Sequence, residues 1–151
     1  MRKFARALTA MLMVALPACG GEDEPSDEPT AVPTMESPAA TDAAVSFVSP
    51  EDGATVTSPV HVQMDAEGVA IEPAAEGVKP NSGHLHIMVD TDCLEAGQVV
   101  PADETHLHFG MAQTEADLTL PPGEHRLCLQ LGDANHTATE LTDEITITVE
   151  G

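Results

Sequence analysis

The chain has 151 residues, with 26 Asp and Glu against five Lys and Arg, and a formal net charge of −21 at pH 7. This balance excludes nucleic acid as a partner, because phosphate contacts require Lys and Arg, and it disfavours docking onto anionic lipid headgroups. Aromatic residues make up 2% of the chain, with no Trp and no Tyr, so there is no aromatic platform on which sugars or bases can stack.

The first 18 residues have the order of features that is typical of a bacterial lipoprotein signal peptide. Three basic residues precede a short apolar run at residues 7–15, which is too short to span a bilayer. The run leads into the sequence LPAC at residues 16–19, which resembles a lipobox, so we predict that cleavage leaves a lipidated Cys19 at the new N-terminus. The lipid is then the only expected membrane contact. Gly20 after the cysteine favours a location in the cell envelope, on the periplasmic face of the outer membrane.

Residues 19–44 are predicted to form a disordered acidic linker that begins with the lipidated cysteine. They are rich in Pro, Asp, Glu, Ser and Thr and contain almost no residue that can build a core, so we expect them to stay extended and solvated. Removal of the signal leaves two basic residues against 26 acidic ones, a net charge of −24. We interpret this charge as a means to solubility, and it identifies no protein partner.

Residues 45–151 have short apolar alternations, separated by turns that contain Pro and Gly, and no helical period. This pattern predicts an immunoglobulin-like antiparallel β-sandwich of six or seven short strands. The predicted strands cover residues 45–48, 60–64, 84–89, 106–109, 116–120, 127–131 and 145–149, with a further short strand as an option at 69–71. Residues 90–105 and 132–143 are predicted to be loops.

Two His-x-His pairs, at residues 84–86 and 106–108, lie in predicted strands. Residues i and i+2 of a strand share a face, so each pair presents two imidazoles on one side. Leu85 and Ile87 point to the opposite side and are predicted to enter the core, which leaves the histidines outside it. His61 and His125 have no i+2 partner and are interpreted as surface residues.

Neutral imidazoles suit Zn²⁺ and Cu²⁺, and a thioether from Met88 or Met111 would favour copper. The candidate metal ligands are His84, His86, His106, His108 and His136, with Asp90 or Asp133 to orient a ligating ring. A weaker hypothesis is a calcium site among the acids of residues 90–104. The alternative to a metal site is a non-catalytic structural or protein-interaction domain, whose histidines only order loops. Convergence of the rings decides between these interpretations.

The two cysteines that remain after Cys19 are predicted to form a disulfide. Cys93 and Cys128 are an even pair in an oxidising compartment, and a bridge between them stabilises the fold by roughly 3–4 kcal/mol in the chain-entropy model. The bridge also removes Cys93 as a nucleophile. The chain has no Gly-x-Ser-x-Gly, no glycine-rich phosphate loop and no His-Glu-x-x-His, so we expect that the protein is not an enzyme.

Residues 49–149 resemble a family of bacterial secreted domains catalogued as domain of unknown function 4399. The residues that carry the resemblance are PNSGHxH at 80–86, DTD at 90–92, PxDxxHxHFG at 101–110, QTE at 113–115, LPPGxH at 120–125 and LGDxxH at 131–136. The resemblance implies the limits of the domain and marks the His-x-His stretch as its signature. No activity is attached to the family, so the resemblance implies no function.

Overall fold

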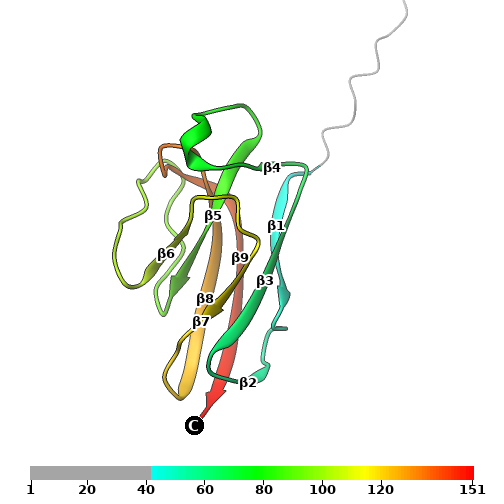
Figure 1. The fold of residues 1–151 in the computed structure, drawn as a ribbon, viewed down its shortest axis with the longest axis vertical. Helices are drawn as coiled ribbons and strands as arrows, with labels where there is room; N and C mark the ends of the chain where they lie inside the picture. The colour runs from blue at the N-terminus through cyan, green and yellow to red at the C-terminus, as the bar shows by residue number, and fades with distance from the viewer. Residues whose placement is uncertain (1–41) are drawn as a thin grey trace, which may run out of the picture. The chain divides into compact units, whose positions relative to one another are not determined.

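The computed structural model describes residues 42–151, and the predicted signal peptide, Cys19 and nearly all of the predicted linker lie outside these residues. Nine strands of the described part form two sheets, which Figure 1 shows as two layers. The elements are β1 (Ala44–Ser49), β2 (Thr55–Thr57), β3 (Val60–Glu67), β4 (Ala70–Ile71), the 3-10 turn η1 (Ala74–Glu76), β5 (Ser82–Val89), β6 (His106–Phe109), β7 (Glu115–Leu118), β8 (Gly123–Gly132) and β9 (Ala138–Glu150).

The predicted β-sandwich is confirmed. The smaller sheet has the order β1-β3-β7, and the larger has the order β2-β9-β8-β5-β4, with β6 paired to β5. Every pairing is antiparallel except the two that involve the shortest strands, β2 with β9 and β4 with β5. No helix among residues 42–151 has the length and apolar character that a membrane crossing requires.

Two strand predictions need correction. β2 was not expected, because a three-residue Thr-Val-Thr segment carries too few alternations to be recognised. β9 begins at Ala138, within the predicted loop of residues 132–143. Its first six residues contain a single large apolar side chain, Leu141, so they lack the alternation that identifies a strand. Pairing with β8 makes this segment a strand, after a register irregularity between Gln130 and Gly132.

The main core lies between the two sheets. β3 contributes alternate buried residues, Val60, Val62 and Met64, while the residues between them are exposed. β5 and β8 contribute their own alternate residues from the other sheet, among them Leu85, Ile87 and Leu129, each fully buried. These residues are the apolar positions that a period of two places on one face, and their burial is the main source of stability for the sandwich.

The other face of β5 and β8 is also buried, because the segment between β5 and β6 (residues 90–105) folds over it. A second, smaller core forms there from Met88, Val100, Cys128 and Ala138. The predicted disulfide between Cys93 and Cys128 is present, with Cα atoms 5.6 Å apart, and it ties the covering segment to β8.

Gln130 adds a second attachment for this covering segment. Its side chain is fully buried, accepts a hydrogen bond from the backbone nitrogen of Leu94 (3.0 Å), and donates to the carbonyl oxygens of Leu94 and Thr139 (both 2.8 Å). Further along, the nitrogen of Val100 donates to the carbonyl oxygen of His136 (2.8 Å). The covering segment therefore has a fixed position over β5 and β8.

Candidate metal centre

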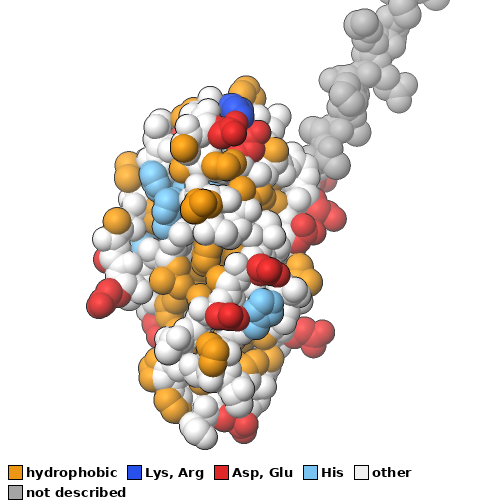
Figure 2. Space-filling view, viewed as in Figure 1, with side chains coloured by type: hydrophobic (Ala, Val, Ile, Leu, Met, Phe, Trp, Pro, Cys, Tyr) orange, Lys and Arg blue, Asp and Glu red, His pale blue; other side chains and the backbone are white. Residues whose placement is uncertain are grey.

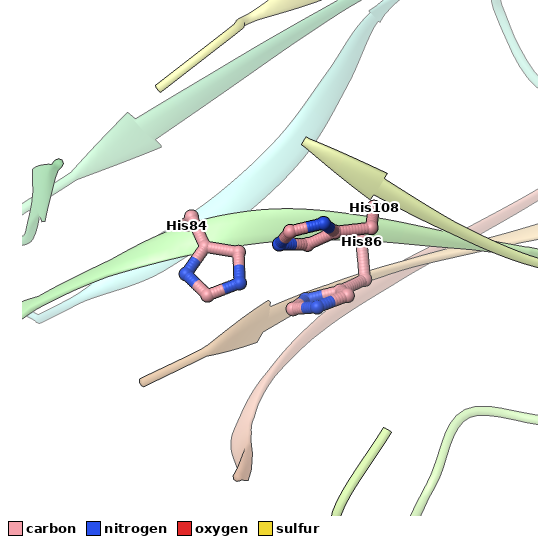
Figure 3. A group of neighbouring side chains, drawn as sticks. All are labelled: His84, His86 and His108. Atoms are coloured by element: carbon pink, nitrogen blue, oxygen red, sulfur yellow. The ribbon is translucent and has the colours of Figure 1, made fainter. Parts of the chain in front are cut away.

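Four histidine rings meet on the covered face of β5. His84 and His86 are two residues apart on β5 and share a face, as strand geometry requires. His108 lies on β6 directly opposite His86 in the register, and His136 lies between β8 and β9. Figure 3 shows the first three rings gathered beside β5. The rings of His86 and His108 are stacked, with 29° between their planes.

The four rings lie close to one another. His84, His86 and His108 each offer one ring nitrogen that lies within 4.8 Å of the others. The ring of His136 lies 5.0, 5.9 and 4.7 Å from these three, measured between ring centres, and its Nε2 is 3.1 Å from Nε2 of His108. Three nitrogens thus face a common space, and a fourth ring closes it from another side.

The inner half of this cluster is buried and lacks hydrogen bonds. His84 and His86 are 0% exposed, and none of their four ring nitrogens has a hydrogen-bond partner among residues 42–151. Buried polar side chains in native proteins nearly always have a partner, so four such atoms in one place require an explanation. His108 is exposed and His136 is half-buried. The cluster therefore runs from the interior of the domain to its surface.

Burial also keeps these rings neutral. Burial, together with a smaller effect of the neighbouring imidazoles, lowers the pKa of His84 to about 4 and that of His86 to about 3. The pKa of His108 is lowered as well, by burial and then by His136. A neutral imidazole has a lone pair available to a metal ion.

Two glycines provide the space that the rings occupy. A Cβ atom on Gly132, which pairs with His84 across the sheet, would lie 2.6 Å from Cε1 of His86. A Cβ atom on Gly110 would overlap the ring of His108. Neither glycine has a positive φ, so backbone conformation does not explain why glycine stands at these positions. The close approach of a histidine ring explains it.

A tight turn directs His136 to the cluster. The side chain of Asp133 accepts hydrogen bonds from the backbone nitrogens of Asn135 and Thr137 (both 2.8 Å). His136 itself has a φ of +63°, a left-handed conformation that is uncommon for residues other than glycine. Such conformations cost stability and concentrate at functional sites.

His106 and three other predicted residues do not join the cluster. The ring of His106 donates from Nδ1 to Asp103 (2.8 Å), which keeps it at the end of β6. Met88 belongs to the second core, and Met111 is 80% exposed. Asp90, a candidate to orient a ligating ring, instead accepts from Nδ1 of His125 (2.8 Å).

Two burial predictions for the histidines are wrong. His84 and His86 were expected outside the core, but both are fully buried: the rings of His108 and His136 lie against them, and residues 99–102 lie beside His86. His125 was interpreted as a surface residue but is only 7% exposed, because its ring is enclosed between Asp90 and the carbonyl oxygen of Pro121 (2.9 Å). His61 is on the surface, where it pairs with Asp117.

A pocket of about 190 Å³ adjoins the cluster. His86, His108 and His136 line one side of it, and Val99, Val100, Pro101 and Ala102 of the covering segment line the other. Figure 2 shows histidine side chains at the molecular surface, close to hydrophobic ones.

A second group with metal-ligand spacing consists of Cys93, Cys128 and Glu144. It is not a metal site, because its two sulfurs form the disulfide.

The signals that sequence reasoning missed were the glycines and the covering segment. Gly110 follows His108 closely in the sequence and makes room for its ring, so it is a local signal, whereas Gly132 makes room for the ring of His86, which is distant in the sequence. The pocket wall at residues 99–102 has no such signal, because its position depends on the disulfide and on Gln130.

Comparison with known proteins agrees with the motifs. The family described as Domain of unknown function (DUF4399) matches residues 62–150, more than half of the chain, and no curated protein matches. A solved structure with some similarity is the X-ray structure of the endo-beta-1,4-mannanase from Thermotoga petrophila, at 17% identity and a TM-score of 0.44. That match covers 73% of this chain and 20% of the mannanase chain, and it carries no argument about function. The chain belongs to the DUF4399 family.

Proposed function

We propose that this domain is a non-catalytic transition-metal-binding module, which a lipid on Cys19 anchors in the cell envelope, on the periplasmic face of the outer membrane. The observation that carries the metal proposal is the group of four ring nitrogens on His84 and His86, which are fully buried and have no hydrogen-bond partner within residues 42–151. A buried polar atom without a partner costs about 1–3 kcal/mol. A metal ion that bonds to one nitrogen of each ring removes part of this cost.

The distances support a single ion. Imidazoles that bind one ion tetrahedrally, with metal–nitrogen bonds of about 2 Å, have ring centres roughly 5 Å apart and nitrogens about 3.3 Å apart. The six distances between ring centres in the cluster lie between 4.6 and 5.9 Å. The nitrogens of His84, His86 and His108 are within 4.8 Å of one another, so small ring rotations bring them to bonding positions.

The donor set favours copper or zinc. All candidate donors are imidazoles, which suit Cu²⁺ and Zn²⁺, and Cu²⁺ binds such sites more tightly than the other first-row divalent ions. Met88 lies in the second core and Met111 lies on the surface. Neither joins the cluster, so the proposed site contains no thioether ligand.

Titration of the purified protein with Cu²⁺ and Zn²⁺ tests the metal proposal. We expect one tight site in the wild type, and at least about a hundredfold loss of affinity in His108→Ala and in His86→Ala. His108 is exposed, so its variant should fold normally. Control variants are His61→Ala and His106→Ala, whose rings pair with Asp117 and Asp103 and whose loss should leave the affinity unchanged.

The contrary result favours the second candidate function, a structural or protein-interaction domain whose histidines only order loops. Equal and weak binding by the wild type and by His108→Ala would remove the metal proposal. The histidine variants would then lower the melting temperature of the protein without any effect of metal on it.

The lipid anchor is tested separately, by incorporation of a labelled fatty acid in a bacterial host. We expect label in the full chain and none in Cys19→Ser, with the wild-type protein in the membrane fraction. A soluble, unlabelled wild-type protein would contradict the anchor and leave the metal proposal intact.

A further inference from the structure

We propose that the bound ion keeps an exchangeable coordination position on its pocket side, where a small monoanion competes with His136. This inference rests on the proposed metal site and adds a ligand class to it. It comes from an asymmetry among the four rings. Three are carried by strands, His84 and His86 on β5 and His108 on β6, while the fourth is carried by a turn.

His136 is the ring that is most readily displaced. Its ring lies 5.9 Å from that of His86, the longest of the six distances between ring centres in the cluster. Its backbone has a strained φ of +63°, whereas the other three rings lie on paired strands. A ligand on a strained turn loses less on dissociation than one on a paired strand, because release of the turn relieves strain.

The pocket provides a path to that position. Its walls include His86, His108 and His136 but not His84, so a molecule in it reaches the cluster beside these three rings. The opposite wall is held in place by backbone hydrogen bonds, from Val100 to the carbonyl oxygen of His136 and from Ala138 to that of Gln98 (both 2.8 Å). The pocket is therefore preformed.

The size and lining of the pocket define the ligand. A volume of about 190 Å³ compares with about 30 Å³ for one water molecule in the liquid, so it admits a ligand of a few heavy atoms. Apart from the histidines, the lining side chains are Val99, Val100, Pro101 and Ala102, none of which carries charge. No lysine or arginine lines it to attract a large anion such as phosphate.

Charge explains the preference for a monoanion. A divalent ion on neutral imidazoles retains its full charge, and an unpaired charge beside apolar groups is unfavourable. Asp133, whose charge acts on His84, is the nearby carboxylate but already accepts two backbone hydrogen bonds. A hydroxide, azide or cyanide ion in the pocket reduces the remaining charge.

The test is a titration of the full chain, loaded with one equivalent of Cu²⁺, with sodium azide. Azide bound to copper gives a charge-transfer absorption band, and copper retention is checked after desalting. We expect saturable binding in the wild type, and tighter binding in His136→Ala, by about tenfold, because the competing ring is absent. Val99→Trp, which fills the pocket mouth, should weaken azide binding by at least about tenfold.

The control is Val78→Trp. Val78 and Val99 are 59% and 66% exposed, but only Val99 lines the pocket, so the control should bind azide as the wild type does. Copper binding without an azide band in the wild type would overturn this inference and leave the metal site standing. Weaker azide binding in His136→Ala than in the wild type would contradict the proposal that azide and His136 compete for one coordination position. Absence of copper binding would overturn both proposals.

Discussion

The two faces of β5 are equally buried but differ in what buries them. On one face, Leu85 and Ile87 pack against the opposite sheet in the main core. On the other, His84 and His86 are also 0% exposed, yet they lie against two further imidazole rings, those of His108 and His136. Burial of the first face stabilises the fold, whereas the second face leaves four ring nitrogens without a partner in the described part of the chain. The first face therefore stabilises the fold, whereas the second face carries the candidate site and lowers the stability of the metal-free protein.

The largest expected effect is on the core face. Ile87→Ala removes a fully buried side chain and should lower the free energy of unfolding by about 3–4 kcal/mol. The affinity for Cu²⁺ should stay within a few fold of wild type, because Ile87 points away from the rings. Chemical denaturation and metal titration measure the two quantities. A large loss of metal affinity in a folded Ile87→Ala protein would show that the two faces are not independent.

The histidine face should respond in the opposite direction. In the metal-free protein, His86→Leu replaces two unpartnered nitrogens with apolar atoms and should raise the free energy of unfolding by about 1–2 kcal/mol. With excess copper the order reverses, because the wild type alone gains stability from binding, about 2.7 kcal/mol at a hundred times Kd. Denaturation with and without copper checks both signs. A loss of stability in the metal-free variant would mean that the ring has partners in solution.

The same comparison shows what sequence can predict. Period-two alternation is a local property, so it predicts the sandwich and the apolar face of β5. It also places His84 beside His86, and separately His106 beside His108. It does not predict which of these rings meet. His108 joins His86 because β6 pairs with β5 in that register, while Asp103 holds His106 by its Nδ1 atom.

What lies on top of a strand is a long-range property. The segment that packs on Met88 and lies beside His86 is held by the Cys93–Cys128 bridge and by Gln130. The cysteine pairing follows from cysteine arithmetic, but a buried glutamine that clamps a distant backbone has no local signature. The same reason explains His125, whose burial depends on Asp90, 35 residues away.

A smaller effect is expected at the glycine that makes room for the site. Gly132→Ala places a Cβ atom 2.6 Å from Cε1 of His86, so the ring must shift away from its neighbours. We expect a loss of metal affinity of about tenfold or more. Displacement of a ligating ring should lower the affinity at least as much as the loss of a group that orients the ring. Isothermal titration measures it, with circular dichroism to confirm the fold. Unchanged affinity would show that the cluster tolerates displacement of His86.

The smallest effect is the pH dependence of His125, which lies outside the cluster. Burial lowers its pKa, but the carbonyl oxygen of Pro121 and the carboxylate of Asp90 outweigh burial and raise it overall. A group whose pKa is higher in the folded state stabilises the fold below its unfolded pKa, and this contribution is lost as the pH rises through the folded pKa. Asp90→Asn should therefore destabilise the protein more at about pH 5.5 than at about pH 8.5, by less than about 1 kcal/mol. Urea denaturation of both proteins at the two pH values measures this difference. An equal loss at both would mean that Asp90 acts through the backbone nitrogen of Arg126, to which its other oxygen is hydrogen-bonded (3.0 Å), and not through the charge of His125.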